Sequence, residues 1–334
     1  MATRTITWSA VICAALLWAN VPADAQIVES VGERALGMGG AFVAVATDSS
    51  AGWWNPAALA DGPFFDLSVG HALDQRDQQF PAARDRSSGL SLSTPVVGAS
   101  LYRFRITDVA SPIEGSTGSR QVVEAPRQVR SLAVSALGGT VVQTLVSGTH
   151  VGATLKYVRG TLRTDGTDDT SPAGALDRGA GLQGGQTEGH FDLDLGALAT
   201  AGPVRLGAVV KNLRATEFAK GAFTLPRQAR VGVAFAAEQA GGPPLTISFD
   251  ADVLAYQTGT GERRVVALGA EDWLVGRRIG LRAGIRKNRV GAGERALTAG
   301  ASIAVRAGTY LEAHVTGSTT SIERGWGAGL RVSF

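Results

Sequence analysis

From about residue 64 onward, apolar and polar residues alternate along short segments that are separated by Gly, Pro, Asp and Ser. The last segment is the clearest: in residues 326–334 every even position is apolar, from Trp326 to Phe334, and every odd position is Gly, Arg or Ser. Successive side chains of a strand point to opposite faces. Each segment therefore predicts a β-strand with one apolar and one polar face.

We count about fourteen such segments. They lie near 64–72, 87–94, 96–106, 127–137, 149–163, 189–200, 203–212, 228–238, 244–255, 263–274, 278–288, 295–306, 308–316 and 325–334. Several have the length of about 9–11 residues that a tilted strand needs to cross a bilayer. An even number of strands closes an antiparallel barrel with both chain ends on one side.

The connections between these segments are of two kinds. The tight ones are 201–203, 276–278 and 307–308, and the long polar ones are 73–86, 107–126, 164–188 and 289–294. Short periplasmic turns and long outer loops are typical of an outer-membrane barrel. A soluble all-β protein with its apolar face inward is the alternative. The C-terminal Phe334 and an export signal favour the membrane barrel.

The fold class expected is therefore all-β, an outer-membrane antiparallel β-barrel of about 14 strands. Its apolar face meets lipid, and its polar face lines the lumen. The charged residues assigned to the lumen by strand phase are Asp192, Asp194, Arg205, Arg230, Asp250, Asp252, Arg282, Arg286 and Arg331. Charges in a narrow barrel need partners, so we expect ion pairs among them. Candidates for an outer aromatic girdle are Tyr102, Tyr157, Trp273, Tyr310 and Trp326.

The N-terminus has the pattern of a cleaved export signal, residues 1–25. Arg4 precedes the apolar run 10–19, and Ala23-Asp24-Ala25 is a small-x-small cleavage site. The run is too short to span the ~30 Å of hydrocarbon in a bilayer as a helix, which argues against the alternative of a membrane anchor. Ile12 argues against the other alternative, a lipoprotein signal at Cys13. Cleavage removes the single Cys of the chain, so the mature protein can form no disulfide.

Residues 26–62 do not alternate, and we predict that they form a hatch inside the barrel formed by 63–334. The segment is rich in Gly at Gly37, Gly39 and Gly40, which allow an irregular backbone to approach a wall closely. Asp48 or Ser49 can cap a short helix through 50–54. Asn55 can cap a second helix with Pro56 in its first turn. Irregular backbone at membrane depth is tolerated only inside protein or a water-filled cavity.

The run from Ala35 through Asp48 to Asn55-Pro56-Ala57 resembles the N-terminal hatch of FadL-type transporters, a superfamily that includes aromatic-hydrocarbon channels and PorV/PorQ-like secretion proteins. The resemblance implies a fourteen-stranded outer-membrane barrel with Gly37, Gly39, Gly40, Asp48, Asn55, Pro56 and Ala57 in the hatch. It also implies passive uptake of hydrophobic small molecules. The alternative is a PorV/PorQ-like scaffold of a protein secretion or surface-attachment system, which the shortness of the chain favours.

Composition narrows the function further. Lys+Arg 32 against Asp+Glu 29 is too even for a nucleic-acid binder, which needs a concentrated basic face. The four histidines show no metal-ligand spacing, and no Ser–His pair is indicated, so we expect no enzyme, no metal and no cofactor. Trp53 and Trp54 either stack on a hydrophobic ligand or pack the hatch. Expected partners are outer-membrane lipid and lipopolysaccharide, the barrel-assembly machinery, and a hydrophobic molecule or a secretion partner protein.

Overall fold

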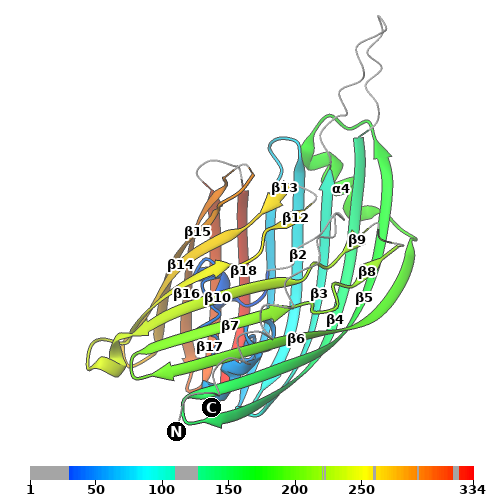
Figure 1. Ribbon diagram of the computed structural model, residues 1–334. Coiled ribbons are helices and arrows are strands. Elements are labelled where there is room, and N and C mark those ends of the chain that lie inside the picture. The colour runs from blue at the N-terminus through cyan, green and yellow to red at the C-terminus, as the bar shows by residue number, and fades with distance from the viewer. Residues whose placement is uncertain are drawn as a thin grey trace, which may run out of the picture.

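Fourteen strands close into an antiparallel barrel in the computed structural model, which describes residues 30–109, 127–219, 221, 223–258, 261–291, 293–318 and 323–334 (Figure 1). The strands are β1 (Asp66–Arg76), β2 (Ala82–Ser93), β3 (Val97–Val109), β4 (Arg127–Val146), β5 (Thr149–Thr167), β6 (Gln186–Ala201), β7 (Val204–Lys211), β10 (Gln228–Ala236), β11 (Leu245–Asp252), β14 (Val265–Leu274), β15 (Ile279–Asn288), β16 (Arg295–Arg306), β17 (Thr309–Ser318) and β18 (Glu323–Ser333). The predicted fold class is confirmed. The predicted signal peptide lies outside the described residues.

Two hairpins and five short helices complete the described chain. The hairpins are β8 (Glu217–Phe218) with β9 (Phe223–Thr224) and β12 (Tyr256–Thr258) with β13 (Gly261–Arg263). The helices are α2 (Glu33–Gly37), α3 (Ala51–Trp54), η1 (Pro56–Asp61), α4 (Pro172–Gly181) and η2 (Ala237–Ala240). Within the part of the chain that is described, no helix is both long and apolar enough to cross a membrane.

Every predicted segment is a strand, but several strands are longer than the sequence indicated. The segment predicted to end at 137 continues to Val146 as β4, because alternation resumes at Val141 after two glycines that resemble a turn. The connection expected at 73–86 is mostly strand, since β1 runs to Arg76 and β2 begins at Ala82. The loop expected at 164–188 contains α4. Residues 110–126 of the loop expected at 107–126 lie outside the described residues.

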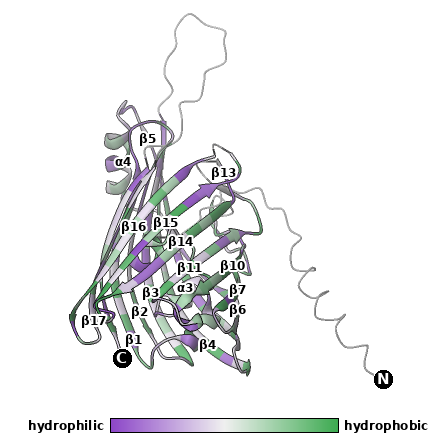
Figure 2. Ribbon diagram, turned by 90° about the vertical axis from the view of Figure 1, so that its left-hand side faces the viewer, coloured by the Kyte–Doolittle hydropathy of each residue, from purple (hydrophilic) through white to green (hydrophobic). Residues whose placement is uncertain are grey.

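The apolar face of the barrel points outward. On β18, Leu330 is 43% exposed and the neighbouring Arg331 is 8% exposed, and on β15 Leu281 is 47% exposed and Arg282 is 4% exposed. Large exposed apolar residues recur in this way on all strands of the wall. Figure 2 shows hydrophobic and hydrophilic residues interspersed along the strands. An apolar outer band with a polar interior is the arrangement that suits a barrel surrounded by lipid.

The expected aromatic girdle is wrong for three of its five residues. Tyr157 and Trp326 face outward, but Tyr102 is buried inside the barrel. Trp273 and Tyr310 share the strand phase of the lumen-facing residues. The guanidinium of Arg282 lies 5.6 Å from the ring of Trp273, and that of Arg331 lies 5.0 Å from the ring of Tyr310. These two aromatic side chains therefore cover inward-facing arginines.

Replacing Phe334 with Asp is expected to impair insertion of the barrel into a bilayer. The Phe334 side chain is 67% exposed, and its ring centroid lies 6.3 Å from that of Phe65 at the end of the barrel where the strands meet the short turns. A charge on the lipid face costs about 1–4 kcal/mol, depending on depth. Refolding yield into lipid vesicles, read from the heat-dependent gel shift of barrels, measures the effect. Phe334→Leu should insert like the wild type, and equal loss in both variants would contradict the argument.

Candidate functional site

The N-terminal segment that we predicted to be a hatch, described from residue 30, lies inside the barrel. Figure 1 shows this segment inside the half of the barrel that carries the C-terminus. Inward glycines of the wall make room for it. A Cβ on Gly152 of β5 would overlap the backbone of Pro56 and Ala57, and one on Gly196 of β6 would overlap the side chain of Asn55. The absence of side chains at these wall positions lets the hatch backbone lie directly against the strands.

Asn55 joins three parts of this assembly and is fully buried. Its Nδ2 donates to Val43 O at 2.9 Å, within the hatch, and to Ala197 O at 3.0 Å, on β6. Its Oδ1 accepts from Ala57 N at 3.2 Å, so Asn55 caps η1, with Pro56 as the first residue. The Asn-Pro-Ala triplet thereby fixes the end of the hatch to the wall.

The glycines and Asp48 lie in the same compact segment. Gly39 and Gly40 adopt φ of +68° and +82° at the end of α2, a conformation that favours glycine, and Gly37 lies against Gly300 of β16. The expected cap of the next helix needs correction. Ser50 occupies the N-cap of α3 without a side-chain cap bond. Asp48 instead accepts from Ser50 N at 3.0 Å and faces Arg34 Nη1 at 3.4 Å, so it braces the turn between two helices.

A buried ion-pair network attaches the hatch to β14 and β15. Arg34 Nε and Nη2 donate to Glu271 Oε1 and Oε2 at 2.8 and 2.6 Å, a bidentate pair. Arg282 Nε donates to the same Oε1 at 2.7 Å. Bidentate arginine–carboxylate pairs are stronger and more directional than single ones. Glu271 was not among the residues singled out in the sequence, although its phase on 263–274 places it on the lumen face.

The network continues around the wall through residues of the predicted lumen set. Arg331 lies between two carboxylates, with Glu312 Oε1 at 3.4 Å and Asp66 Oδ2 at 3.9 Å. Asp250 accepts from the backbone N–H groups of Phe42 and Val43 in the hatch, both at 2.8 Å. Neighbouring Arg230 pairs with Asp252 at 2.7 Å. Arg205 Nη2 lies 3.9 Å from Asp61 of η1, and Arg286 pairs with Glu323 of β18.

Asp192 and Asp194 hold the wall together where its ladder is incomplete. β6 pairs with β7 only through Leu195–Ala201, and β7 ends at Lys211. Beyond that point Asp194 Oδ1 accepts from Asn212 N at 2.8 Å, and Asp192 accepts from Arg214 N at 3.0 Å. Lys156 Nζ is 2.7 Å from Asp194. Side-chain acceptors thus replace part of a strand ladder along residues 212–219.

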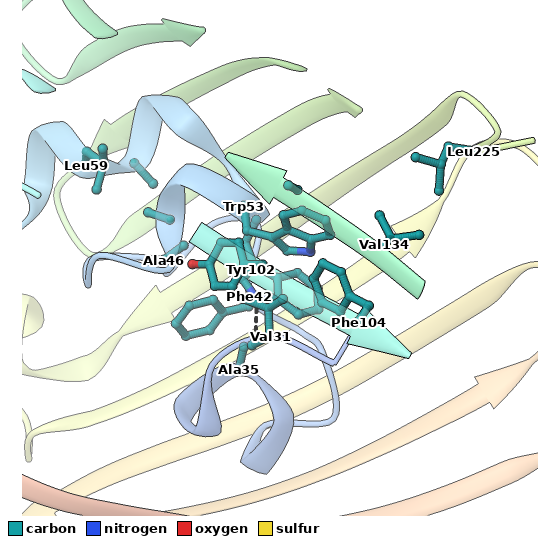
Figure 3. Packing of buried hydrophobic residues seen from close by; sticks show 14 of the residues in the cluster. Val31, Ala35, Phe42, Ala46, Trp53, Leu59, Tyr102, Phe104, Val134 and Leu225 are labelled. Carbon is teal, nitrogen blue, oxygen red and sulfur yellow. Dashed lines mark hydrogen bonds between the residues drawn. The ribbon is translucent and has the colours of Figure 1, made fainter. Parts of the chain in front are cut away.

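The lumen has an apolar half that the sequence analysis missed. On β3, β4 and β5 the inward residues near the long loops are Tyr102, Phe104, Ile106, Leu132, Val134, Ala136 and Val158, all buried. Trp53 of the hatch packs on this surface, with its ring centroid 5.3 Å from Tyr102 and 5.2 Å from Phe104 (Figure 3). The sequence Tyr102-Arg103-Phe104-Arg105-Ile106 contains the pattern that indicates this surface. Its apolar residues share the inward strand phase, and its two arginines have the outward phase.

A cavity of about 10 Å³ remains in this apolar half, lined by Trp53, Phe104, Val134, Ala136, Val158 and Leu225 with Lys156, Lys211, Asn212 and Gln228. Lys211 Nζ lies 4.1 Å from the Trp53 ring centroid. The β8–β9 hairpin covers the loop side, with Phe218 and Phe223 packed at 5.7 Å and buried in the same cluster. Trp54 packs elsewhere, edge-on to Phe42 at 6.1 Å, and donates Nε1 to Val31 O.

Glu33 of α2 supplies a pH-dependent contact. Burial, together with the nearby carboxylates of Glu312 and Asp48, raises the pKa of Glu33 to about 8, and its carboxyl group lies against Gly70 and Gly329 beside a polar cavity of about 30 Å³. The folded state therefore holds a proton that the unfolded state loses above about pH 4.5. The stability from this group is present below pH 4.5 and is lost as the pH rises towards 8.

We expect Glu33→Gln to flatten the pH dependence of barrel stability between about pH 4.5 and 8, where a single proton contributes at most roughly 1.4 kcal/mol per pH unit. Denaturant unfolding in detergent at several pH values measures it. The control is Glu238→Gln, an exposed position in η2 between β10 and β11, which should leave the dependence of stability on pH unaltered. An unchanged slope in Glu33→Gln would show that the hatch carboxyl group is not the titrating group.

The histidines of the described residues are not gathered into one site. His71, His150, His190 and His314 lie on four different strands, and among the described residues no group of three or more His, Cys, Asp or Glu side chains is placed to hold a metal ion. The described lumen has an apolar side, on which Trp53 packs, and an ionic side formed by the ion pairs of the inner wall. Asn55 attaches the N-terminal segment to the wall between them.

Comparison with known proteins agrees with this architecture. The structure of the toluene transporter TodX from P. putida superposes with a TM-score of 0.62 at 15% identity, over 92% of this chain and 99% of that chain. The CymD monoaromatic hydrocarbon channel gives 0.61 at 14% identity, over 91% and 97%. A Pseudomonas aeruginosa FadL homologue gives 0.60 at 11% identity, over 92% and 99%.

Sequence comparison adds one partial match. A family model described as "F plasmid transfer operon, TraF, protein" matches residues 88–252, and no curated protein matches the sequence significantly. These comparisons give no support to the PorV/PorQ-like branch. At such low identities the structural likeness concerns the fold, so the chain has the barrel fold of FadL- and TodX-type channels.

Proposed function

We propose that this protein is an outer-membrane channel for passive uptake of small hydrophobic molecules. The observation that carries the proposal is the apolar half of the lumen. Its wall runs along β3, β4 and β5 from the Asp108–Arg130 pair on the loop side to Trp53, in a barrel whose opposite inner wall is ionic. A purely structural stopper needs no such surface, whereas a solute that leaves water for it gains ~25 cal/mol per Å² of buried apolar area.

The arrangement of aromatic rings around the cavity favours a small, flat solute. Trp53, Tyr102 and Phe104 present ring edges and faces around one point, which suits stacking with an aromatic ring. The neighbours named as toluene and monoaromatic hydrocarbon channels support the same class of solute. The cavity of about 10 Å³ is too small for such a molecule, so the β8–β9 hairpin with Phe218 and Phe223 has to move aside during uptake.

The incomplete ladder beside β6 is the proposed way out. Asn212 lines the apolar cavity and also begins the segment held by Asp194, which accepts from Asn212 N, and by Asp192, which accepts from Arg214 N and Thr216 Oγ1. Opening this segment breaks these side-chain bonds and one backbone bond to β6, from Leu213 N to Leu193 O, rather than a continuous strand ladder. The solute then leaves sideways, into the apolar surroundings of the barrel.

Placing a large side chain in the apolar wall tests the proposal. Ala136→Trp is expected to fill the cavity and reduce uptake of a radiolabelled monoaromatic into protein-containing liposomes severalfold, because Ala136 is 3% exposed and faces the lumen. Ala99→Trp makes the same change on the lipid face and should leave uptake unaltered. Equal uptake by wild type, Ala136→Trp and protein-free liposomes would refute the transport role.

A second candidate is a non-transport role in a transfer or secretion assembly. The match of residues 88–252 to the TraF model and the ion-paired hatch support it. Chemical cross-linking in outer membranes followed by purification separates the two. A stoichiometric protein partner, combined with no solute uptake by the purified barrel, would favour the assembly role.

A further inference from the structure

The outer wall carries four arginines directly beyond the edge of the apolar band, and none of them pairs with an acidic residue that the structure describes. The last apolar row on this side is formed by the register partners Leu90, Leu101, Leu137, Tyr157 and Phe191 on β2 to β6. Each of these side chains is exposed on the outside of the barrel. This row therefore marks where hydrocarbon contact ends on β2–β6.

The next two rows toward the long loops are basic. Arg103 follows Leu101 on β3 and Arg159 follows Tyr157 on β5, and both pair in register with Ser135 of β4. One row further, Arg86 of β2 stands directly opposite Arg105 of β3. Strand spacing of about 4.8 Å and a rise of about 3.3 Å per residue place Arg103 within about 10 Å of each of the other three positions, and the four positions span about 16 Å from Arg86 to Arg159. We call Arg86, Arg103, Arg105 and Arg159 the arginine patch.

Within the described part of the chain, the arginine patch has no acidic partner. Arg86, Arg103 and Arg159 are exposed and make no hydrogen bond or ion pair with any residue that the structure describes. Arg105 uses Nη1 for the carbonyl of Ala180 in α4, at 2.8 Å. Two carboxylates on the loop side of the patch are engaged elsewhere, because Asp177 pairs with Arg84 and Asp165 with Arg178.

α4 closes the patch on the loop side. It lies outside the barrel (Figure 2), where Ala175 and Leu176 are buried against Ala82, Val109 and Val129 of β2, β3 and β4. The arginine patch thus lies between an apolar band below and a packed helix above. Like charges directly opposite each other destabilise a sheet, so the Arg86–Arg105 pair is unfavourable unless an anion lies between the two side chains.

We propose that the arginine patch binds the phosphate groups of a phosphorylated glycolipid of the outer leaflet, of the lipopolysaccharide type. Guanidinium groups bind phosphate oxygens with two parallel hydrogen bonds. The acyl chains would lie along Leu101, Leu137 and Tyr157, and the phosphates at the level of Arg103 and Arg159. The inference rests on the outer-membrane location proposed above, but not on solute transport.

Native mass spectrometry of the full barrel in neutral detergent tests this with diphosphorylated lipid A as the probe. Removing Arg86, Arg103 and Arg159 together, as the triple Arg→Gln variant, is expected to lower the affinity roughly 100-fold. The matched control, Arg277→Gln/Arg278→Gln/Arg306→Gln, removes the same charge from exposed turns at the opposite end and should change the affinity by less than about twofold. Triple Arg→Lys should lie between wild type and Arg→Gln.

Three results would overturn the proposal. The first is equal binding of dephosphorylated lipid A by the wild type, and the second is an equal loss in the control triple variant. The third is tighter binding of phosphatidylglycerol vesicles with the same dependence on the arginine patch. The heat-dependent gel shift and thermal stability of the variants report folding. Solute uptake by the Arg→Gln variant, measured in the same preparations, separates a failure of this site from a failure of the transport proposal.

Discussion

Replacing Glu271 with alanine is expected to lower the unfolding free energy of the barrel by about 3–5 kcal/mol, because it removes the main carboxylate partner of two buried cations, Arg34 and Arg282. Glu271 is 2% exposed and accepts hydrogen bonds from both Arg34 of the hatch and Arg282 of β15. The hatch loses its bidentate attachment to the wall. Denaturant unfolding in detergent, followed by tryptophan fluorescence, measures the loss.

The control for this experiment is Glu238→Ala. Glu238 pairs with the exposed Arg277 at a turn, and exposed pairs contribute about 0.2–1 kcal/mol. Adding Arg34→Met to the Glu271→Ala variant removes one of the stranded cations and is expected to restore part of the stability. If the double variant is as unstable as Glu271→Ala alone, the lost stability comes from the empty space left by the Glu271 side chain and not from unpaired charge.

Gly152→Val is expected to displace the hatch and raise the ionic conductance of the barrel severalfold. Any Cβ at this position overlaps the backbone of Pro56 and Ala57, which cannot rotate away as a side chain would. Overpacking of this kind costs about 1–3 kcal/mol when the structure adapts. Here the adaptation available is movement of η1 away from β5, which opens the bore. Single-channel recording in planar bilayers measures it.

Gly139→Val is the matched control, since a Cβ on Gly139 of β4 meets nothing within 4 Å and points to lipid. It should conduct like the wild type. A variant that changes both Asn55 and Pro56 is expected to act in the same direction as Gly152→Val, because it removes the bonds from Asn55 to Val43 and Ala197. Wild-type conductance in both hatch variants would show that residues 30–62 do not close the pore.

The strand order and the outward apolar face followed from the sequence because a two-residue period is a local property. Leu330 and Arg331 alternate in the chain, and they alternate in exposure. The same reasoning assigned Arg282, Arg331 and Asp250 to the lumen side. The girdle prediction was wrong for Tyr102, because it used the aromatic residue type and not the strand phase, which places this side chain inside.

The apolar half of the lumen does not follow from the alternation, because the same alternation predicts an outward apolar face along every strand. On the loop side of the apolar outer band, Phe104 points inward and Arg103 points outward. The polar residues of the alternation therefore lie on the outer face there. The change of meaning depends on where a residue sits relative to the membrane. That height is set by register across β2 to β5, which one strand's sequence does not contain.

By itself the sequence determined a β-barrel of about fourteen strands with an N-terminal segment that lacks the pattern of a strand, because periodicity, length and glycine content are local properties of the chain. Only the tertiary structure decided which wall residues meet the hatch. Arg34 and Glu271 are separated by 237 positions, and Gly152 and Ala57 by almost a hundred. Such pairings arise from closure of the sheet around the segment, and closure brings together residues whose order along the chain carries no record of the contact.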